Sequence, residues 1–178
     1  VGSMTPTASR SEVLNFPAVY YYTPASFAVH SDSTLTVPQL TGKTICTTAA
    51  STWEMYLQGD LDMLDAPAFT YDVTPGTITS LVDGAACLDD VRLGAGVRND
   101  GMIDSLPMLL AAIDAGYPIK VLGSPAFYEP LSLATDKGND DPELDAELAR
   151  IIADMQKDYT LSLLSIQHFK NADGSSED

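Results

Sequence analysis

The neighbouring residues Ser51 and Thr52 could bind a small anion. Small residues precede them, and Glu54 follows Ser51 by three positions, which is the spacing of a capping box that opens a helix. Free backbone N–H groups at a helix N-terminus attract carboxylate or phosphate, and the two hydroxyls could add donors. From this spacing alone, the more common situation is a Ser51 that only caps its own helix.

Arg10 and Asp104 could hold the charged ends of a zwitterion. Arg10 is one of four arginines and follows a hydroxyl-rich stretch, so its guanidinium could grip a carboxylate with two hydrogen bonds. Asp104 and Ser105 end a predicted strand and could accept an ammonium group. Each position also has a plain structural alternative: Arg10 could pair with Glu12, and Asp104 could cap the next helix.

Sequence signatures of common enzymes do not occur in this chain. His30 and His168 are the only histidines, and no GxSxG turn accompanies them. Walker, GxGxxG, HExxH and EF-hand spacings are missing as well. We therefore expect no catalytic residue, no metal and no cofactor.

Two cysteines, Cys46 and Cys87, stand far from each other in the sequence. Neither has a second cysteine or a histidine at close spacing, so they do not form a zinc site. Their spacing leaves two alternatives open, either two buried thiols or one disulfide. A disulfide would close a loop of about 40 residues and contribute about 3–4 kcal/mol.

The composition describes a folded, strongly acidic protein. The 178 residues are 45% hydrophobic, and 25 Asp and Glu against 9 Lys and Arg give a net charge of −16. The length suits one domain or two small ones. Such a surface repels phosphate backbones and anionic lipid, which argues against a nucleic-acid or membrane-surface partner. No stretch approaches the roughly 20 apolar residues of a membrane span.

Strand-like and helix-like segments alternate along the chain. This alternation indicates an α/β protein with a largely parallel sheet, whose ligands would gather at the carboxyl ends of the strands. Strands are predicted at residues 26–30, 44–48, 69–73, 101–103, 119–122 and 131–134, and helices at 51–58, 78–86, 107–116, from 141 onward and at 161–169.

An ordered series of short motifs resembles one protein family. The motifs are Gly2–Arg10, Asn15–Pro17, Tyr20–Tyr21, Leu40–Ile45, Ala50–Thr52, Asp100–Pro107, Tyr128–Pro130 and Asp136–Gly138. Together they resemble the extracytoplasmic solute-binding proteins, family 3, that serve polar amino-acid ABC transporters. The resemblance runs from Val1 to about Phe169.

This resemblance implies an α/β, type II periplasmic-binding-protein-like fold with lobe 2 complete and lobe 1 partial. Lobe 2 would be residues 24–126. Partial lobe 1 would be residues 1–23 and 127–178, including hinge crossings near Tyr20–Thr23 and Phe127–Pro130. Roughly the first third of the family's pattern has no counterpart here, so we expect exposed apolar surface on lobe 1 and self-association.

The resemblance also assigns residues to a ligand site. Arg10 would hold the α-carboxylate of an amino acid, and the family's ammonium-binding aspartate aligns with Ser105, one residue after Asp104. Some members also bridge cysteines at positions like Cys46 and Cys87. The implied ligand-binding set is Ser3, Thr5, Arg10, Ser51, Thr52, Trp53, Asp104 and Ser105.

The implied function is the non-enzymatic substrate-binding component of an amino-acid ABC importer. Hinge closure would trap the ligand between the lobes, and the partners would be the permease subunits of the transporter. The location would be extracytoplasmic, in the periplasm or as a cell-surface lipoprotein with a secretion signal, which permits the Cys46–Cys87 disulfide. The same fold also serves as ligand-sensing domains of receptors and as dehydratase-type enzymes, which are the alternatives.

Overall fold

The computed structural model describes residues 2–169 and divides the chain into two compact units. Unit 1 is Val1–Thr23, Asp62–Pro67 and Tyr128–Asp178, and unit 2 is Pro24–Leu61 and Ala68–Phe127. The division predicted from the sequence differs in two places. Residues 62–67 belong to unit 1 because Met63 forms an antiparallel bridge with Thr7, and Phe127 belongs to unit 2 because its ring stacks on Tyr56.

Unit 2 contains a mixed sheet. The strands follow the order β3 (Val19–His30), β6 (Gly101–Ser105), β4 (Thr44–Thr48) and β5 (Thr77–Leu81). β4 runs parallel to β5 and β6, whereas β3 pairs antiparallel with β6. The expectation of a largely parallel sheet is therefore wrong for β3, which enters unit 2 from unit 1.

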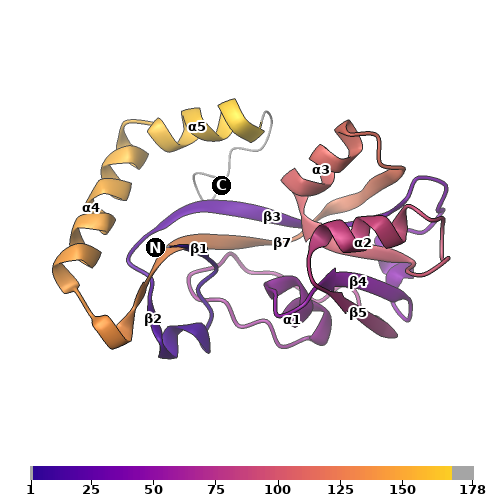
Figure 1. The fold of residues 1–178 in the computed structure, drawn as a ribbon, viewed down its shortest axis with the longest axis horizontal. Helices are drawn as coiled ribbons and strands as arrows, with labels where there is room; N and C mark the ends of the chain where they lie inside the picture. Colours follow the sequence, from indigo (N-terminus) through magenta and orange to yellow (C-terminus); the bar gives the residue numbers. More distant parts are fainter. Residues whose placement is uncertain (1, 170–178) are drawn as a thin grey trace. The chain divides into compact units, whose positions relative to one another are not determined.

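Three helices cover the two faces of this sheet (Figure 1). α2 (Gly84–Val91) and α3 (Leu106–Asp114) pack on the face that carries Ala28 and Met102. α1 (Thr52–Gln58) packs on the other face through Tyr56, whose ring lies 6.3 Å from that of Phe27. Successive strand residues point to opposite faces, so Phe27 and Ala28 mark the two sides.

The core beneath α2 and α3 contains a disulfide between Cys46 of β4 and Cys87 of α2. This confirms the pairing that the resemblance implied. Both cysteines are fully buried among Leu88, Met102 and Leu109. The bridge therefore ties a central strand to its covering helix inside the apolar core.

Two predicted elements of unit 2 are wrong. Residues 69–73 are not a strand, because the Tyr56 hydroxyl donates to the Thr70 carbonyl and accepts from the Asp72 N–H. The predicted helix at 78–86 is instead the strand β5 followed by the start of α2. Its β-branched residues favour a strand, and Asp83 caps α2 by accepting from the Ala86 N–H.

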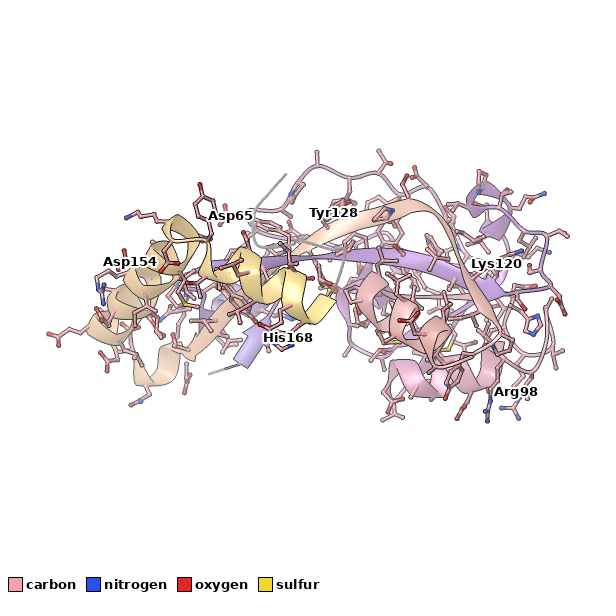
Figure 2. The ribbon with its side chains drawn as sticks, turned by 90° about the horizontal axis from the view of Figure 1, so that it is seen from above. Asp65, Arg98, Lys120, Tyr128, Asp154 and His168 are labelled. Atoms are coloured by element: carbon pink, nitrogen blue, oxygen red, sulfur yellow. A yellow bond between two sulfur atoms is a disulfide. The ribbon has the colours of Figure 1, made fainter. Side chains whose placement is uncertain are left out.

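Unit 1 is built on the long strand β7 (Ile119–Asp136), which begins in unit 2. Two separate strands were predicted there. Short strands β1 (Gly2–Met4) and β2 (Leu14–Asn15) pair antiparallel with β7. Helices α4 (Pro142–Lys157) and α5 (Thr160–Phe169) follow, and Figure 2 labels Asp154 on α4 and His168 on α5.

Short 3₁₀ helices complete the structure at Arg10–Glu12, Val37–Leu40 and Lys137–Asn139. Within the described part of the chain, no helix is both long and apolar enough to span a membrane.

Candidate ligand-binding site

Arg10 lies in a turn of unit 1 that its own neighbours hold in place. Its backbone N–H donates to Thr7 Oγ1 at 3.3 Å, and its Nη1 donates to the Thr5 carbonyl at 2.9 Å. Burial lowers the pKa of the Arg10 guanidinium, and the nearby Glu129 carboxylate opposes this shift. The guanidinium is thus partly buried, and the backbone carbonyl of Thr5, directly after β1, orients it.

Thr5 and Glu129 form a buried polar pair beside Arg10. The Thr5 hydroxyl donates to Glu129 Oε2 at 2.8 Å, and the two residues are 4% and 3% exposed. Sequence reasoning named Thr5 but missed Glu129. The sequence does carry a signal for Glu129, because it is a charged residue inside the Tyr128–Pro130 motif and inside a mostly apolar strand.

Residues 62–64 hold the loop that leads to Arg10. The Ala8 N–H donates to the Asp62 carbonyl at 3.2 Å, and the Leu64 N–H donates to the Pro6 carbonyl at 3.0 Å. Residues 62–64 carry no recognisable motif, and they lie more than 50 positions from the loop that they contact. The sequence therefore does not predict this contact.

Ser3 lies on β1 opposite Leu133 in the strand register. Its side chain is outside the described part of the structure. The ligand-binding role expected for Ser3 stays a prediction.

Ser51 caps the helix that it precedes, as the plain structural alternative stated. Its Oγ accepts from the Glu54 N–H at 3.2 Å and donates to the Thr48 carbonyl at 2.6 Å. Glu54 returns the contact by accepting from the Ala50 N–H at 2.6 Å. Thr52 is 4% exposed. The chain itself therefore supplies partners for the Ala50 and Glu54 N–H groups at this helix start.

Three of the expected residues meet at a pocket of unit 2 with a volume of about 470 Å³. They are Trp53 of α1, Asp104 of β6 and Ser105 at the start of α3. The complete lining is Thr48, Trp53, Gly84, Ala85, Leu88, Asp104, Ser105, Met108, Ala111, Ala112 and Tyr117.

Asp104 faces the side of the sheet that α2 and α3 cover. It is 4% exposed and lies two positions after Met102 on β6, so both side chains point to the same face. Its Oδ1 accepts from the Ser105 N–H at 2.7 Å. A side chain at Gly84 of α2 would overlap Asp104 Oδ2. The glycine at the start of α2 therefore makes room for the carboxylate.

Two polar atoms in this region lack a hydrogen-bond partner within the described part of the chain. They are the indole Nε1 of Trp53, which lines the pocket, and the Oγ of Ser26, which pairs in register with Asp104. Buried polar atoms normally have partners.

No group of three or more His, Cys, Asp or Glu among residues 2–169 could hold a metal ion.

Known proteins resemble this chain in sequence and in structure. The model of the bacterial extracellular solute-binding proteins, family 3, matches residues 1–171. The probable amino-acid-binding protein YxeM of Bacillus subtilis is 28% identical over 166 residues, which cover 92% of this chain and 58% of YxeM. The chain thus spans somewhat more than half the length of that relative.

Two solved structures share the fold. The substrate-binding protein of an amino acid ABC transporter has a TM-score of 0.74 at 20% identity, with coverage of 94% of this chain and 69% of the other. An ancestral arginine-binding protein bound to arginine has a TM-score of 0.72 at 21% identity, with coverage of 93% and 69%. Because the family model covers nearly the whole sequence, this chain belongs to the bacterial extracellular solute-binding proteins, family 3.

Proposed function

We propose that this chain is the amino-acid-binding component of an ABC importer and works outside the cytoplasm. Its partners would be the permease subunits of that importer, and the process would involve no catalytic step. Membership of the family and the similarity to YxeM, a probable amino-acid-binding protein, support the proposal.

The observation that carries the proposal is the state of Arg10. Among residues 2–169, the other three arginines form salt bridges, namely Arg92 with Asp89, Arg98 with Asp90 and Arg150 with Glu147. Arg10 forms none in the same part of the chain and donates instead to a backbone carbonyl. A guanidinium has five N–H donors in a planar fork that fits a carboxylate. In a protein of net charge −16, a partly buried arginine that forms no salt bridge among residues 2–169, and whose nearby Glu129 carboxylate accepts from Thr5, suits an anionic ligand group.

The remaining roles follow from this placement. Arg10 would bind the α-carboxylate, with Thr5 and Glu129 holding the surrounding strand ends. In unit 2, Asp104 would accept the α-ammonium group, and Trp53 and Ser105 line the same pocket. Ser3, Ser51 and Thr52 stay candidates from the family resemblance, although the Ser51 hydroxyl already caps α1. Closure of two lobes around the ligand also stays a prediction.

Substitution of Arg10 tests the proposal. Purified chain is titrated by calorimetry with each of the common amino acids, and the Arg10→Ala and Arg10→Lys variants are then titrated with the best ligand. Loss of a buried carboxylate partner costs about 2–5 kcal/mol, so Arg10→Ala should weaken binding at least about 30-fold. The affinity of Arg10→Lys should lie between those of the parent chain and Arg10→Ala, because lysine keeps the positive charge but loses the planar fork of N–H donors.

The matched control is Arg98→Ala, which removes an arginine of unit 2 whose side chain is 64% exposed (Figure 2). The affinity of Arg98→Ala for the best ligand should stay within about twofold of that of the parent chain, since exposed ion pairs contribute little. Absence of binding by any amino acid to folded protein would contradict the proposed function. Equal affinity of Arg10→Ala and the parent chain would remove Arg10 from the site.

A further inference from the structure

Glu129 is a charged residue in the interior of unit 1. It lies on β7 and is 3% exposed, and its Oε2 accepts a hydrogen bond from the Thr5 hydroxyl at 2.8 Å. A carboxylate is rarely buried this far unless a cation lies nearby. The Thr5 hydroxyl binds an oxygen atom of Glu129, but it carries no positive charge. The buried carboxylate therefore needs a cation in its surroundings.

Thr5 connects Glu129 to Arg10 within unit 1. The hydroxyl of Thr5 donates to the Glu129 carboxylate, and the carbonyl of Thr5 accepts from Arg10 Nη1 at 2.9 Å. Both charged groups thus contact the same residue. Burial lowers the pKa of the Arg10 guanidinium, and the Glu129 carboxylate opposes this shift, as a nearby negative charge does.

The Arg10 guanidinium stays available to a ligand in spite of this neighbour. The salt bridges found among residues 2–169 include no pair of Arg10 with Glu129. A guanidinium has five N–H donors, and Nη1 binds the Thr5 carbonyl, which leaves other donors for a carboxylate. The charge of Glu129 therefore acts on Arg10 without occupying these donors.

Two opposite charges at one place change which anions Arg10 can bind. A ligand carboxylate is attracted by the guanidinium and repelled by Glu129, and such interactions are stronger between partly buried groups than in water. A zwitterion carries an ammonium group next to its carboxylate, and this positive charge offsets the repulsion. A simple carboxylate anion carries no such group, so it meets the full repulsion.

We infer that Glu129 makes the Arg10 site select zwitterions over simple carboxylate anions such as 2-hydroxy acids and 2-oxo acids. This inference rests on the proposed binding of an amino acid at Arg10 and assigns its charge selectivity to one residue. Glu129 acts through Arg10 as a positioning residue: it binds Thr5, whose carbonyl orients the guanidinium, and it supplies the opposing charge.

Calorimetric titration of the whole chain compares the amino acid that binds most tightly with its 2-hydroxy acid, which for alanine is lactate. Glu129→Gln keeps the shape of the side chain and an acceptor for Thr5 but removes the charge. It should tighten binding of the 2-hydroxy acid about fivefold or more, and lower the preference for the amino acid about tenfold or more. A merely structural role of Glu129 would weaken both ligands by the same factor and leave the preference unchanged.

Glu129→Asp and Glu143→Gln are the matched controls. Glu129→Asp keeps the charge, so the preference should stay within about threefold of that of the parent chain. Glu143→Gln removes the same charge from an exposed position in the first turn of α4, where water screens it, so the preference should stay within about twofold.

Thermal unfolding of each variant reports whether the fold is intact. If Glu129→Gln does not fold, the double variant Thr5→Val, Glu129→Met replaces it, because it removes the donor and the acceptor of the buried hydrogen bond together. This double variant should lower the preference for the amino acid in the same way.

The outcomes separate this inference from the proposed function. No binding of any amino acid to the folded parent chain overturns both. Amino-acid binding with an unchanged preference in the folded uncharged variant overturns the inference alone. A preference that falls only because the amino acid binds more weakly also overturns it, since Glu129 would then act on the ammonium group and not through Arg10. If the parent chain does not bind the 2-hydroxy acid measurably, binding by the uncharged variant supports the inference and its absence overturns it.

Discussion

The two units of this protein differ in how many apolar residues they bury. Among residues 2–169, the buried apolar side chains lie mostly in unit 2, and unit 1 contributes Pro6, Tyr21, Pro130 and Ile152. Both units bury polar residues, and in unit 1 these include Thr5, Thr7 and Glu129. Unit 2 thus has an apolar core of its own, whereas hydrogen bonds between short segments hold the loop of unit 1 that carries Arg10.

The helices of unit 1 sharpen the contrast. On α4 and α5, the large apolar residues Leu144, Ile151, Leu163, Leu164 and Ile166 are between 39% and 64% exposed. Exposed apolar patches often mark surfaces that pack against other protein, so the self-association expected from the sequence stays a prediction. We therefore expect the stability of unit 2 and the position of Arg10 to have separate structural sources, which substitutions in each unit can test.

The largest effect should come from removing the disulfide of unit 2. In the double variant Cys46→Ala, Cys87→Ala, the disulfide that joins two residues 41 positions apart is lost. On the chain-entropy model, this loss lowers the free energy of unfolding by about 4 kcal/mol. Urea denaturation of the parent and variant measures the difference. A decrease below about 1 kcal/mol would mean that the apolar core of unit 2 needs no covalent support.

Leu64→Pro tests the hydrogen-bonded loop of unit 1. Proline removes the N–H that donates to the Pro6 carbonyl, and loss of such a bond costs about 1–3 kcal/mol. Hydrogen exchange should become faster at residues 7–11, and affinity for the amino acid should fall at least about fivefold. Leu64→Ala keeps the N–H and is the control, since Leu64 is 37% exposed.

If Leu64→Pro exchanges at residues 7–11 like Leu64→Ala, then residues 62–64 do not hold the Arg10 loop. If hydrogen exchange becomes faster but affinity does not change, then residues 62–64 do hold the loop. In that case the order of the loop does not determine how tightly Arg10 binds the amino acid.

Local rules were sufficient for the elements whose signals lie close together in the sequence. Ser51 and Glu54 predicted the start of α1, Asp141 and Pro142 predicted the start of α4, and Pro107 predicted the first turn of α3. Each signal is a cap or a fixed φ angle, which acts within one helical turn. The Cys46–Cys87 bridge came only from the family resemblance, because spacing left two alternatives open.

Long-range pairing explains what the sequence could not predict. The bridge between Thr7 and Met63 places residues 62–67 in unit 1, and no local pattern announces such a contact. Glu129 stands out in the sequence as a charged residue, but its pairing with Thr5 spans 124 positions and has no local signal. The face on which Asp104 lies depends on the register of β6, and a shift of one residue would reverse it.

The smallest of the predicted effects concerns Tyr56, where unit 2 buries a polar group among aromatic rings. Burial raises the pKa of the Tyr56 hydroxyl, and the Asp72 N–H that donates to it opposes this shift. A raised pKa in the folded state means that the unfolded chain loses its proton first, so this group's contribution to stability is complete below about pH 10 and falls as pH rises above it. Tyr56→Phe should lower the free energy of unfolding at pH 7 by about 1–2 kcal/mol, because it removes the hydrogen bonds to Thr70 and Asp72. The loss stays small because both partners are exposed and can bind water instead. The variant should also lose less stability than the parent between pH 9 and pH 11 in urea denaturation. An equally steep alkaline loss in both proteins would assign that loss to other groups, and it would leave the hydroxyl of Tyr56 with a purely hydrogen-bonding role in unit 2.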